Sequence, residues 1–334
     1  MADAIVSVAA PAKLNLYLHV TGRRDDGYHL LDSLIAFADV GDEIKARAAA
    51  DGSLTLTVRG PFAKDLADET NNLVLRAARR LREIAGITAG AHFVLEKRLP
   101  VASGSGGGSA DAAAALKALC RVWGVEMAEA RMRALALELG ADVPVCWVGR
   151  PAFIGGIGDE IEAAPPLPPA PLVLVNAKVP VSTPAVFKAR TGGFQGPDRF
   201  RETPIDAAHL AYLLKTRGNG LTEAACAFCP PVAKVLDALD ATEAPLLTRM
   251  SGSGGTCFAL YETAEAALAA AARLYDAEPD WWVAVGRLAP PADGLNWAAR
   301  TVVSTPRIPC PGPTDGLRSR PVPVGNGHPA IGAW

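Results

Sequence analysis

Two loops rich in glycine and serine carry the clearest chemical signal in this sequence of 334 residues. The first, Ser-Gly-Ser-Gly-Gly-Gly-Ser at 103–109, lies between a predicted strand and a predicted helix. Glycines at such a junction let backbone N–H groups converge on an anion at the positive end of a helix dipole. The loop therefore predicts a phosphate cradle, with a structural glycine turn as the alternative. It is not a Walker A loop, because no Gly-Lys-Ser/Thr follows, and Ser109 replaces the third glycine of a dinucleotide fingerprint.

A second loop of small residues, Ser-Gly-Ser-Gly-Gly-Thr at 251–256, directly precedes a predicted strand at 256–261. Two such loops far apart in one chain suggest a single polyanionic ligand held between two domains. Taken alone, the second loop is also typical of a tight turn before a strand.

Lys13 and Asp142 could supply the charge and the base for phosphoryl transfer. Transfer to an alcohol requires positioned phosphates, neutralised charge and often a carboxylate that accepts the hydroxyl proton. Lys13 and Asn15 interrupt an otherwise apolar strand, where an unpartnered cation would be costly to bury. Asp142 follows the predicted end of a helix. A solvent-facing lysine and a turn or capping aspartate are the structural alternatives.

Elements that alternate in the sequence must position these residues. Apolar and polar residues alternate around 4–8, 14–18 and 54–58, which predicts strands, partly in antiparallel pairs. Asn71 or Asn72 and Gly86 bound an amphipathic helix. The same reasoning predicts helices at 112–123, 126–139, 206–216, 222–239 and 263–276, and strands at 92–95, 172–175, 256–261 and 281–287. An alternating, partly antiparallel α/β plan fits this order better than a barrel or a sandwich.

Length and proline content divide the chain. A chain of this length exceeds the usual size of one domain. A proline-rich stretch at 165–171 precedes a buried strand, so we predict one domain over 1–164 and another over 165–288. The remainder, 289–334, is rich in proline and glycine and lacks periodic apolar residues, which predicts a disordered tail.

Composition excludes several classes of function. The chain has 33 basic and 35 acidic residues and no dense Lys/Arg run, which argues against nucleic acid as a partner. No stretch approaches the roughly 20 apolar residues that span a bilayer, so we expect no membrane partner and a cytoplasmic protein. Six scattered cysteines are typical of a reducing compartment, and the Cys226 and Cys229 pair lacks further ligands for a metal site.

In their order along the chain, these segments resemble the GHMP family of small-molecule kinases, named for galactose, homoserine, mevalonate and phosphomevalonate. The resemblance covers about 4–288 and depends on three stretches: Pro-Ala-Lys-Leu-Asn at 11–15, Leu-Pro with the first glycine loop and its Ala-Asp-Ala-Ala at 99–113, and the second loop at 251–256. It implies a mixed α+β fold of two domains. The N-terminal α/β domain would bind ATP, the C-terminal domain would be ferredoxin-like, and the active site would lie in the cleft between them.

Two further stretches are more specific than the glycine loops. Gly-Arg-Arg-Asp-Asp-Gly-Tyr-His at 22–29 and Gly-Ala-Asp-Val-Pro-Val at 140–145 resemble one branch of the family. Its members phosphorylate the 2-hydroxyl of a cytidine diphosphate derivative of methylerythritol, a step of non-mevalonate isoprenoid precursor synthesis. The resemblance implies an ATP-dependent kinase with ATP and Mg²⁺ as cofactors. We expect it to be a monomer or a homodimer.

The resemblance also implies roles for single residues. Asp142 would take the proton of the hydroxyl, and Lys13 would keep Asp142 charged while stabilising charge near the acceptor oxygen. Asn15 would contact the substrate beside Lys13. Tyr28 would stack on the cytosine ring and His29 would hydrogen-bond its edge.

Segments of the second half would complete the substrate site. Val-Ser-Thr-Pro-Ala-Val-Phe at 181–187 resembles the family segment in which Thr183 meets the substrate and Phe187 forms the other wall of the cytosine slot. The second glycine loop would close over the diphosphate, with Gly252, Ser253 and Gly254 as its binding residues.

The first glycine loop and its flanks would wrap the phosphates of ATP. The residues expected to bind ATP are Pro100, Val101, Ala102, Ser103, Gly104, Ser105, Gly106, Gly107, Gly108 and Ser109. Ser109 is also the one candidate ligand for Mg²⁺, and no other metal ligand is assigned.

Three features depart from the family pattern. Family loops often read Gly-Leu-Gly-Gly-Gly, whereas Ser-Gly-Ser precedes the three glycines here, which could alter packing on the adenine side. Asn219-Gly220-Leu221 resembles a family Asn-Asp-Leu whose acid is missing, so we assign it no catalytic role. The tail has no counterpart in the family core.

Two other functions remain open at this point. One is a GHMP kinase for another small alcohol, against which Tyr28, His29 and Phe187 argue, since a cytosine slot has no purpose for mevalonate or homoserine. The other is a nucleotide-binding regulator without catalysis. The presence of both Lys13 and Asp142 argues against the regulator.

Overall fold

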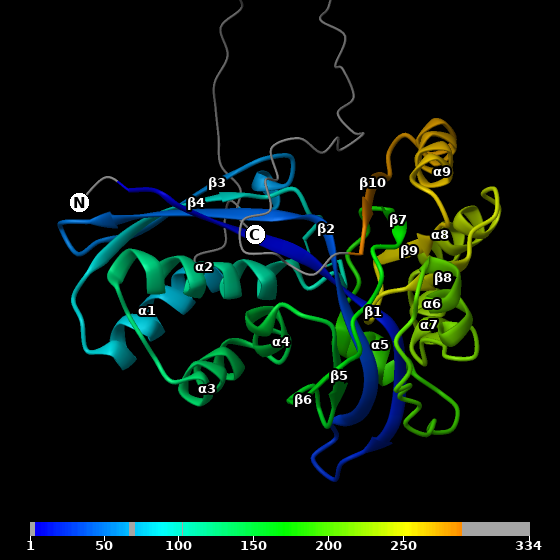
Figure 1. The fold of residues 1–334 in the computed structure, drawn as a ribbon, viewed down its shortest axis with the longest axis horizontal. Helices are drawn as coiled ribbons and strands as arrows, with labels where there is room; N and C mark the ends of the chain where they lie inside the picture. Colours follow the sequence, from blue (N-terminus) through cyan, green and yellow to red (C-terminus); the bar gives the residue numbers. More distant parts are fainter. Residues whose placement is uncertain (1–3, 67–70, 102, 289–334) are drawn as a thin grey trace, which may run out of the picture. The chain divides into compact units, whose positions relative to one another are not determined.

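The structure, a computed structural model, describes residues 4–66, 71–101 and 103–288 (Figure 1). Its strands in this part of the chain are β1 (Val6–Arg23), β2 (His29–Ala49), β3 (Leu54–Arg59), β4 (Gly90–Glu96), β5 (Ala152–Gly155), β6 (Glu160–Ala163), β7 (Pro171–Asn176), β8 (Leu247–Met250), β9 (Thr256–Leu260) and β10 (Trp282–Arg287). Its α-helices are α1 (Leu73–Ala85), α2 (Gly107–Trp123), α3 (Glu129–Leu139), α4 (Val143–Val148), α5 (Thr183–Ala189), α6 (Ala207–Leu214), α7 (Thr222–Phe228), α8 (Pro230–Asp240) and α9 (Ala264–Ala277). A 3₁₀ turn, η1 (Ala63–Leu66), follows β3.

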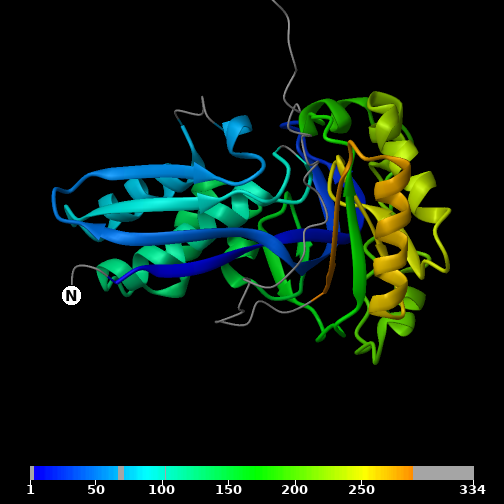
Figure 2. The same ribbon diagram turned by 90° about the horizontal axis from the view of Figure 1, so that it is seen from above.

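The first sheet is built around two long antiparallel strands. β1 and β2 pair along nearly their whole length. On its other edge, β2 pairs with β5 near its start and with β4 near its end. The order of the sheet is β3-β4-β2-β5-β6, with β1 on β2, and only β3 and β4 are parallel. Helices α1 to α4 cover one face of this sheet (Figures 1 and 2).

The second sheet has the order β10-β7-β9-β8 and is antiparallel throughout. Along the chain, β7 is followed by a helical segment, β8, β9, α9 and β10. This β-α-β-β-α-β order is the ferredoxin-like arrangement. Figure 2 shows α9 running along β7 and β10 on one side of the sheet. The chain changes sheets between β6 and β7, where we predict the domain boundary, and that boundary stays a prediction.

Successive side chains of a β-strand point to opposite faces, so the second sheet has a hydrophobic core on each of its two faces. Val173 and Val175 of β7 face α8 and α9. Leu172 and Leu174 of the same strand face residues of β1, β2 and α6. One face of the second sheet therefore shares a hydrophobic core with the long strands of the first.

Several expected elements are confirmed and four need correction. α1 begins after Asn72, whose side chain accepts from the N–H of Val74 at 2.9 Å, and ends at Gly86 in a left-handed conformation, as predicted. α2 begins at Gly107 rather than at 112, because the glycines themselves form its first turn. α3 begins at Glu129 rather than at 126.

The other two corrections involve prolines. The helix predicted over 222–239 is in fact two helices, because Pro230 removes the preceding Cys229 from helical geometry. The connection predicted after Gly140 is the short helix α4, in which Pro144 occupies the first turn, where its missing N–H costs nothing.

No helix among the described residues is long and apolar enough to cross a membrane. The tail predicted over 289–334 lies outside the described residues.

Candidate active site

The first glycine loop ends in the N-terminus of α2. Gly106 precedes the helix with φ of 64°, in the left-handed region. A Cβ at this position would also lie 3.0 Å from Lys13 Cε, so both the backbone conformation and the close approach of Lys13 favour glycine. The N–H groups of Gly107, Gly108 and Ser109 belong to the first turn and have no acceptor within the helix. They provide donors for an anion at the positive end of the helix.

The two glycine loops contact one another directly. The N–H of Thr256 donates to Ser103 O at 2.7 Å, and the Ser251 hydroxyl donates to Gly104 O at 3.3 Å. Gly104 has φ of 71°, and a Cβ there would overlap Gly254 O and lie 2.8 Å from Ser251 O. The structure therefore places the second loop against the first, and it needs glycine at 104 to do so.

Lys13 and Asp142 meet beside the first loop. Lys13 Nζ lies 2.9 Å from Asp142 Oδ2 and donates to Asn15 Oδ1 at 3.0 Å. The Lys13 side chain is 4% exposed and that of Asp142 44%. Asp142 makes no capping bond to α4. The lysine is therefore not solvent-facing, and Asp142, which holds the N-cap position of α4 without a side-chain capping bond, presents an accessible carboxylate to it.

Backbone contacts hold β1 in place around this pair. The N–H of Lys13 donates to Ser105 O at 2.9 Å. The N–H of Asn15 donates to the Ser251 hydroxyl at 3.1 Å, and its side-chain amide donates to the Ser33 hydroxyl at 2.8 Å. Both glycine loops thus bind the strand that carries Lys13 and Asn15.

Helix α5 contributes two of the predicted substrate residues. Thr183 and Phe187 lie four residues apart and so on one face of the helix. The Thr183 hydroxyl lies 2.7 Å from the Ser253 hydroxyl of the second loop. The Phe187 ring stacks on His29, with ring centroids 5.1 Å apart and an angle of 26° between the planes.

The predicted cytosine slot has a different resting arrangement. Tyr28 is 63% exposed, and among the described residues it is His29, not Tyr28, that stacks on Phe187. Burial, with Arg23 and Arg190 nearby, lowers the pKa of His29 below its ordinary value, so the neutral ring is favoured. The slot between Tyr28 and Phe187 stays a prediction.

A buried cluster of charged side chains, which lies against α2, is not predicted from the sequence. Lys97 Nζ lies 2.6 Å from Asp42 Oδ2 and 2.8 Å from Asp111 Oδ2, and all three side chains are almost fully buried. Burial raises the pKa of Asp111, an effect that Lys97 opposes and Asp42 reinforces. Lys97 Nζ is 3.0 Å from the place of a Cβ at Gly107, so the ammonium lies close against the first turn of α2. In the sequence, the position of Asp111 within a run of alanines is the feature that could have indicated this cluster.

The residues fit a metal held chiefly by phosphates. No group of three or more His, Cys, Asp or Glu side chains suited to a metal occurs within the described residues. Mg²⁺ commonly binds through one or two protein oxygens together with substrate phosphates and waters. Ser109, in the first turn of α2, is compatible with that mode.

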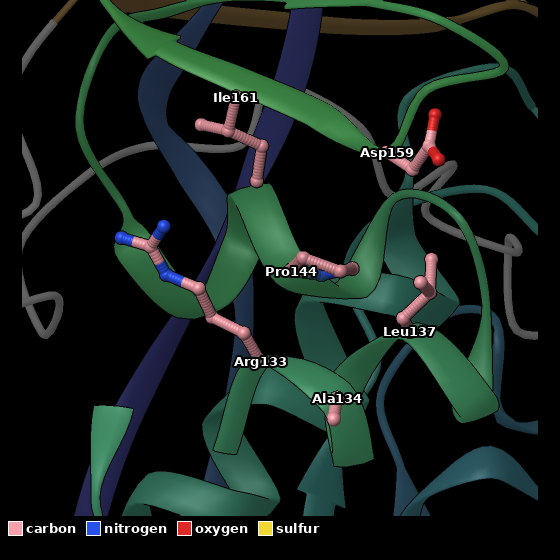
Figure 3. A pocket seen from close by; sticks show the side chains of 6 residues that line it. All are labelled: Arg133, Ala134, Leu137, Pro144, Asp159 and Ile161. Carbon is pink, nitrogen blue, oxygen red and sulfur yellow. The ribbon is translucent and has the colours of Figure 1, made fainter. Parts of the chain in front are cut away.

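A pocket lies between α3, Pro144 of α4 and the β5–β6 region. Figure 3 shows Pro144 of α4 between two groups of lining residues, from α3 and from the β5–β6 region. Its lining residues are Arg133, Ala134, Leu137, Pro144, Asp159 and Ile161. None of the predicted site residues that the structure describes lines this pocket.

Two family models match the chain. The GHMP kinases N terminal domain matches 72–150, and the GHMP kinases C terminal model matches 206–279. The first match contains the first glycine loop and Asp142, and the second contains the second glycine loop.

Individual relatives match most of the chain. It is 54% identical over 282 residues to the 4-diphosphocytidyl-2-C-methyl-D-erythritol kinase of Paramagnetospirillum magneticum, covering 84% of this chain and 98% of that protein. It is 50% identical over 287 residues to the enzyme of the same name from Rhodospirillum rubrum, covering 86% and 93%. A crystal structure of 4-(cytidine 5'-diphospho)-2C-methyl-D-erythritol kinase matches with a TM-score of 0.67 and 34% identity over 85% of this chain and 99% of that one. The chain belongs to the 4-diphosphocytidyl-2-C-methyl-D-erythritol kinase family of GHMP kinases.

Proposed function

We propose that this chain transfers the γ-phosphoryl group of ATP to the 2-hydroxyl of 4-diphosphocytidyl-2-C-methyl-D-erythritol. The products are the 2-phosphate and ADP, and the step belongs to the methylerythritol phosphate route to isoprenoid precursors. The relatives support the substrate. The observation that carries the proposal is the pair of Lys13 and Asp142, 2.9 Å apart beside two interlocked glycine loops.

The first loop binds the phosphates of ATP in this proposal. The free N–H groups at the start of α2 donate to phosphate oxygens, and the helix dipole favours their negative charge. The cradle is predicted over 100–109, of which Ala102 lies outside the described residues. Mg²⁺, held by the phosphates with Ser109, neutralises negative charge when it is bound.

The chemical step then needs a base and a cation at the acceptor hydroxyl. Asp142 accepts the hydroxyl proton as the acceptor oxygen forms its bond to the γ-phosphorus, and the bond to the ADP oxygen breaks. Lys13 stabilises negative charge at the acceptor oxygen. Because Lys13 is bound to Asp142 and Asn15 at once, these three groups have a fixed geometry before the substrate arrives.

The acceptor lies across the second loop and α5. Gly252, Ser253 and Gly254 contact its diphosphate, and Thr183 contacts it from α5. The cytosine ring displaces the contact between His29 and Phe187, so that it stacks on Phe187 and Tyr28 while His29 hydrogen-bonds its edge. Tyr28 is exposed and therefore free to close over the base.

An assay of ADP release with Mg-ATP tests this function. The acceptors to compare are 4-diphosphocytidyl-2-C-methyl-D-erythritol, mevalonate and homoserine. We expect turnover with the cytidine compound alone. Turnover with mevalonate or homoserine instead would indicate a kinase for another alcohol, and ATP binding without turnover on any acceptor would favour a regulator.

A further inference from the structure

Asn219, which the catalytic proposal does not use, binds the second glycine loop through its side chain. Its amide nitrogen donates to Met250 O and to Gly252 O, both at 2.8 Å. Its amide oxygen accepts from the N–H of Leu221 at 2.9 Å. Both amide hydrogens and the oxygen are therefore engaged, which fixes the orientation of the side chain.

The backbone around Asn219 is attached to the strand that carries Lys13 and Asn15. The N–H of Leu18 donates to Gly218 O at 3.0 Å, and the N–H of Gly220 donates to Leu18 O at 2.7 Å. Asn219 thus connects β1 to the loop, and its position follows that of the catalytic strand.

The hydrogen bonds that Met250 O and Gly252 O accept from Asn219 determine which way the peptide groups of the second loop face. In a trans peptide, the carbonyl and the following N–H point in opposite directions. Because Gly252 O points at Asn219, the N–H of Ser253 points away from it. In the described part of the chain this N–H has no backbone acceptor. The Ser253 hydroxyl contacts Thr183, so the residue lies next to the helix that carries Phe187.

We propose that Asn219 is a positioning residue for the acceptor: it holds the carbonyls of Met250 and Gly252 so that the Ser253 N–H donates to the diphosphate of the substrate. This inference depends on the proposed function of the site. Asn219 itself does not touch the substrate.

The missing acid of the Asn-Asp-Leu pattern does not weaken this role. A Cβ at Gly220 would lie 2.5 Å from Gln195 Oε1, so the Gln195 amide occupies the adjoining space. Gln195 also pairs with Val20 of β1 through its backbone N–H at 2.9 Å. The contacts that join Asn219 to β1 and to the loop involve no side chain at position 220.

Two substitutions test the role. Asn219→Asp keeps the oxygen that accepts from Leu221 but sets a carboxylate oxygen against two carbonyls, and Asn219→Ala removes the contacts altogether. We expect the KM for the cytidine acceptor to rise about tenfold or more, while the KM for ATP stays within about twofold. Gln195→Ala is the matched control, because it removes an amide that contacts β1 but not the loop, and its kinetics should be unchanged.

Binding of simple probes separates this inference from the proposed function. Calorimetry with cytidine diphosphate and with cytidine requires no turnover. We expect Asn219→Asp to weaken cytidine diphosphate about tenfold and to leave cytidine unaffected. Equal weakening of both probes, an equal rise in both KM values with a lower melting temperature, no change, or no binding of cytidine diphosphate to the wild-type protein would each overturn the inference. Absence of turnover with the full acceptor, despite the expected probe binding, would count against the proposed function alone.

Discussion

At the scale of single residues, the two charged side chains of the site, Lys13 and Asp142, differ in their exposure to solvent. Lys13 is buried and bound by two oxygens, whereas Asp142 keeps nearly half of its side-chain surface exposed. A general base must be accessible to the hydroxyl whose proton it removes. The ammonium that pairs with the base must leave the binding position of the substrate open. The difference in exposure between the two side chains meets both requirements.

Replacing Asp142 by asparagine should abolish most of the turnover and spare nucleotide binding. The asparagine would keep the size of the side chain but could not accept a proton, so we expect kcat to fall by about 10² or more. The Kd for ATP, measured by calorimetry, should change little. Asp159→Asn is the control, because its Oδ1 accepts the N–H of Ile157 and an asparagine oxygen can do the same. Near-normal turnover of Asp142→Asn would remove Asp142 from the role of base.

The ring of His29 should titrate below an ordinary histidine. Burial and two nearby arginines disfavour the imidazolium, so its pKa lies under the usual value of about 6.5. The ring therefore stays neutral as the pH falls to that value, and becomes charged only below it. An NMR titration of its Cε1 proton should show the midpoint rising in Arg190→Gln. Arg201→Gln, whose arginine pairs with Glu162, should leave the midpoint unchanged. Identical midpoints in all three proteins would contradict the contribution assigned to Arg190.

At the scale of elements, glycines decide how closely the two loops approach. Gly104 lies against the backbone of the second loop, whereas Gly86 at the end of α1 has nothing within 4 Å of where a Cβ would be. Both have left-handed φ angles, of 71° and 66°. Both positions therefore need a residue that tolerates a left-handed φ, but a side chain would meet neighbouring atoms only at position 104.

Gly104→Ala should therefore damage the enzyme more than Gly86→Ala. Each alanine suffers a left-handed penalty of about 1–2 kcal/mol in the free energy of unfolding. Only the alanine at position 104 would also force Gly254 and Ser251 away from the first loop. We expect Gly104→Ala to lose more stability in urea unfolding and to lower kcat/KM, while Gly86→Ala retains normal kcat/KM. Equal losses in the two variants would show that contact between the loops contributes nothing.

The elements also show what sequence reasoning could reach. Asn72 and Gly86 bound α1 as predicted, because capping is local and depends on residue types at fixed offsets. The family motifs predicted Lys13 and Asp142, and the structure brings them together. The Lys97 cluster and the bonds of Asn219 were not predicted, since they join residues that only the tertiary fold places side by side. The stacking of His29 on Phe187 likewise depends on packing between distant segments.

At the scale of the whole described chain, β1 and β2 serve both sheets. They pair with each other in the first sheet, and their Leu14, Leu16 and Ala36 lie in one buried cluster with Leu174 and Phe258 of the second. The buried Arg249 of β8 donates to Leu16 O at 2.9 Å. Burial lowers the pKa of this arginine to about 10, so the contact places a desolvated cation against β1. The catalytic strand is thus fixed by residues from both halves of the sequence.

A fragment limited to 165–288 should consequently fail to fold alone. It would keep the ferredoxin-like order of strands, yet one face of its sheet would lose the partners that β1 and β2 supply, among them Leu14 and Leu16. Exposed apolar surface costs about 25 cal/mol per Å², and a small domain has little stability to spare. We expect poorly dispersed amide NMR signals and no cooperative thermal transition for the fragment, against a cooperative transition for residues 1–288. A folded, monomeric fragment with dispersed signals would show instead that the second sheet is stable by itself and that β1 only positions the active site.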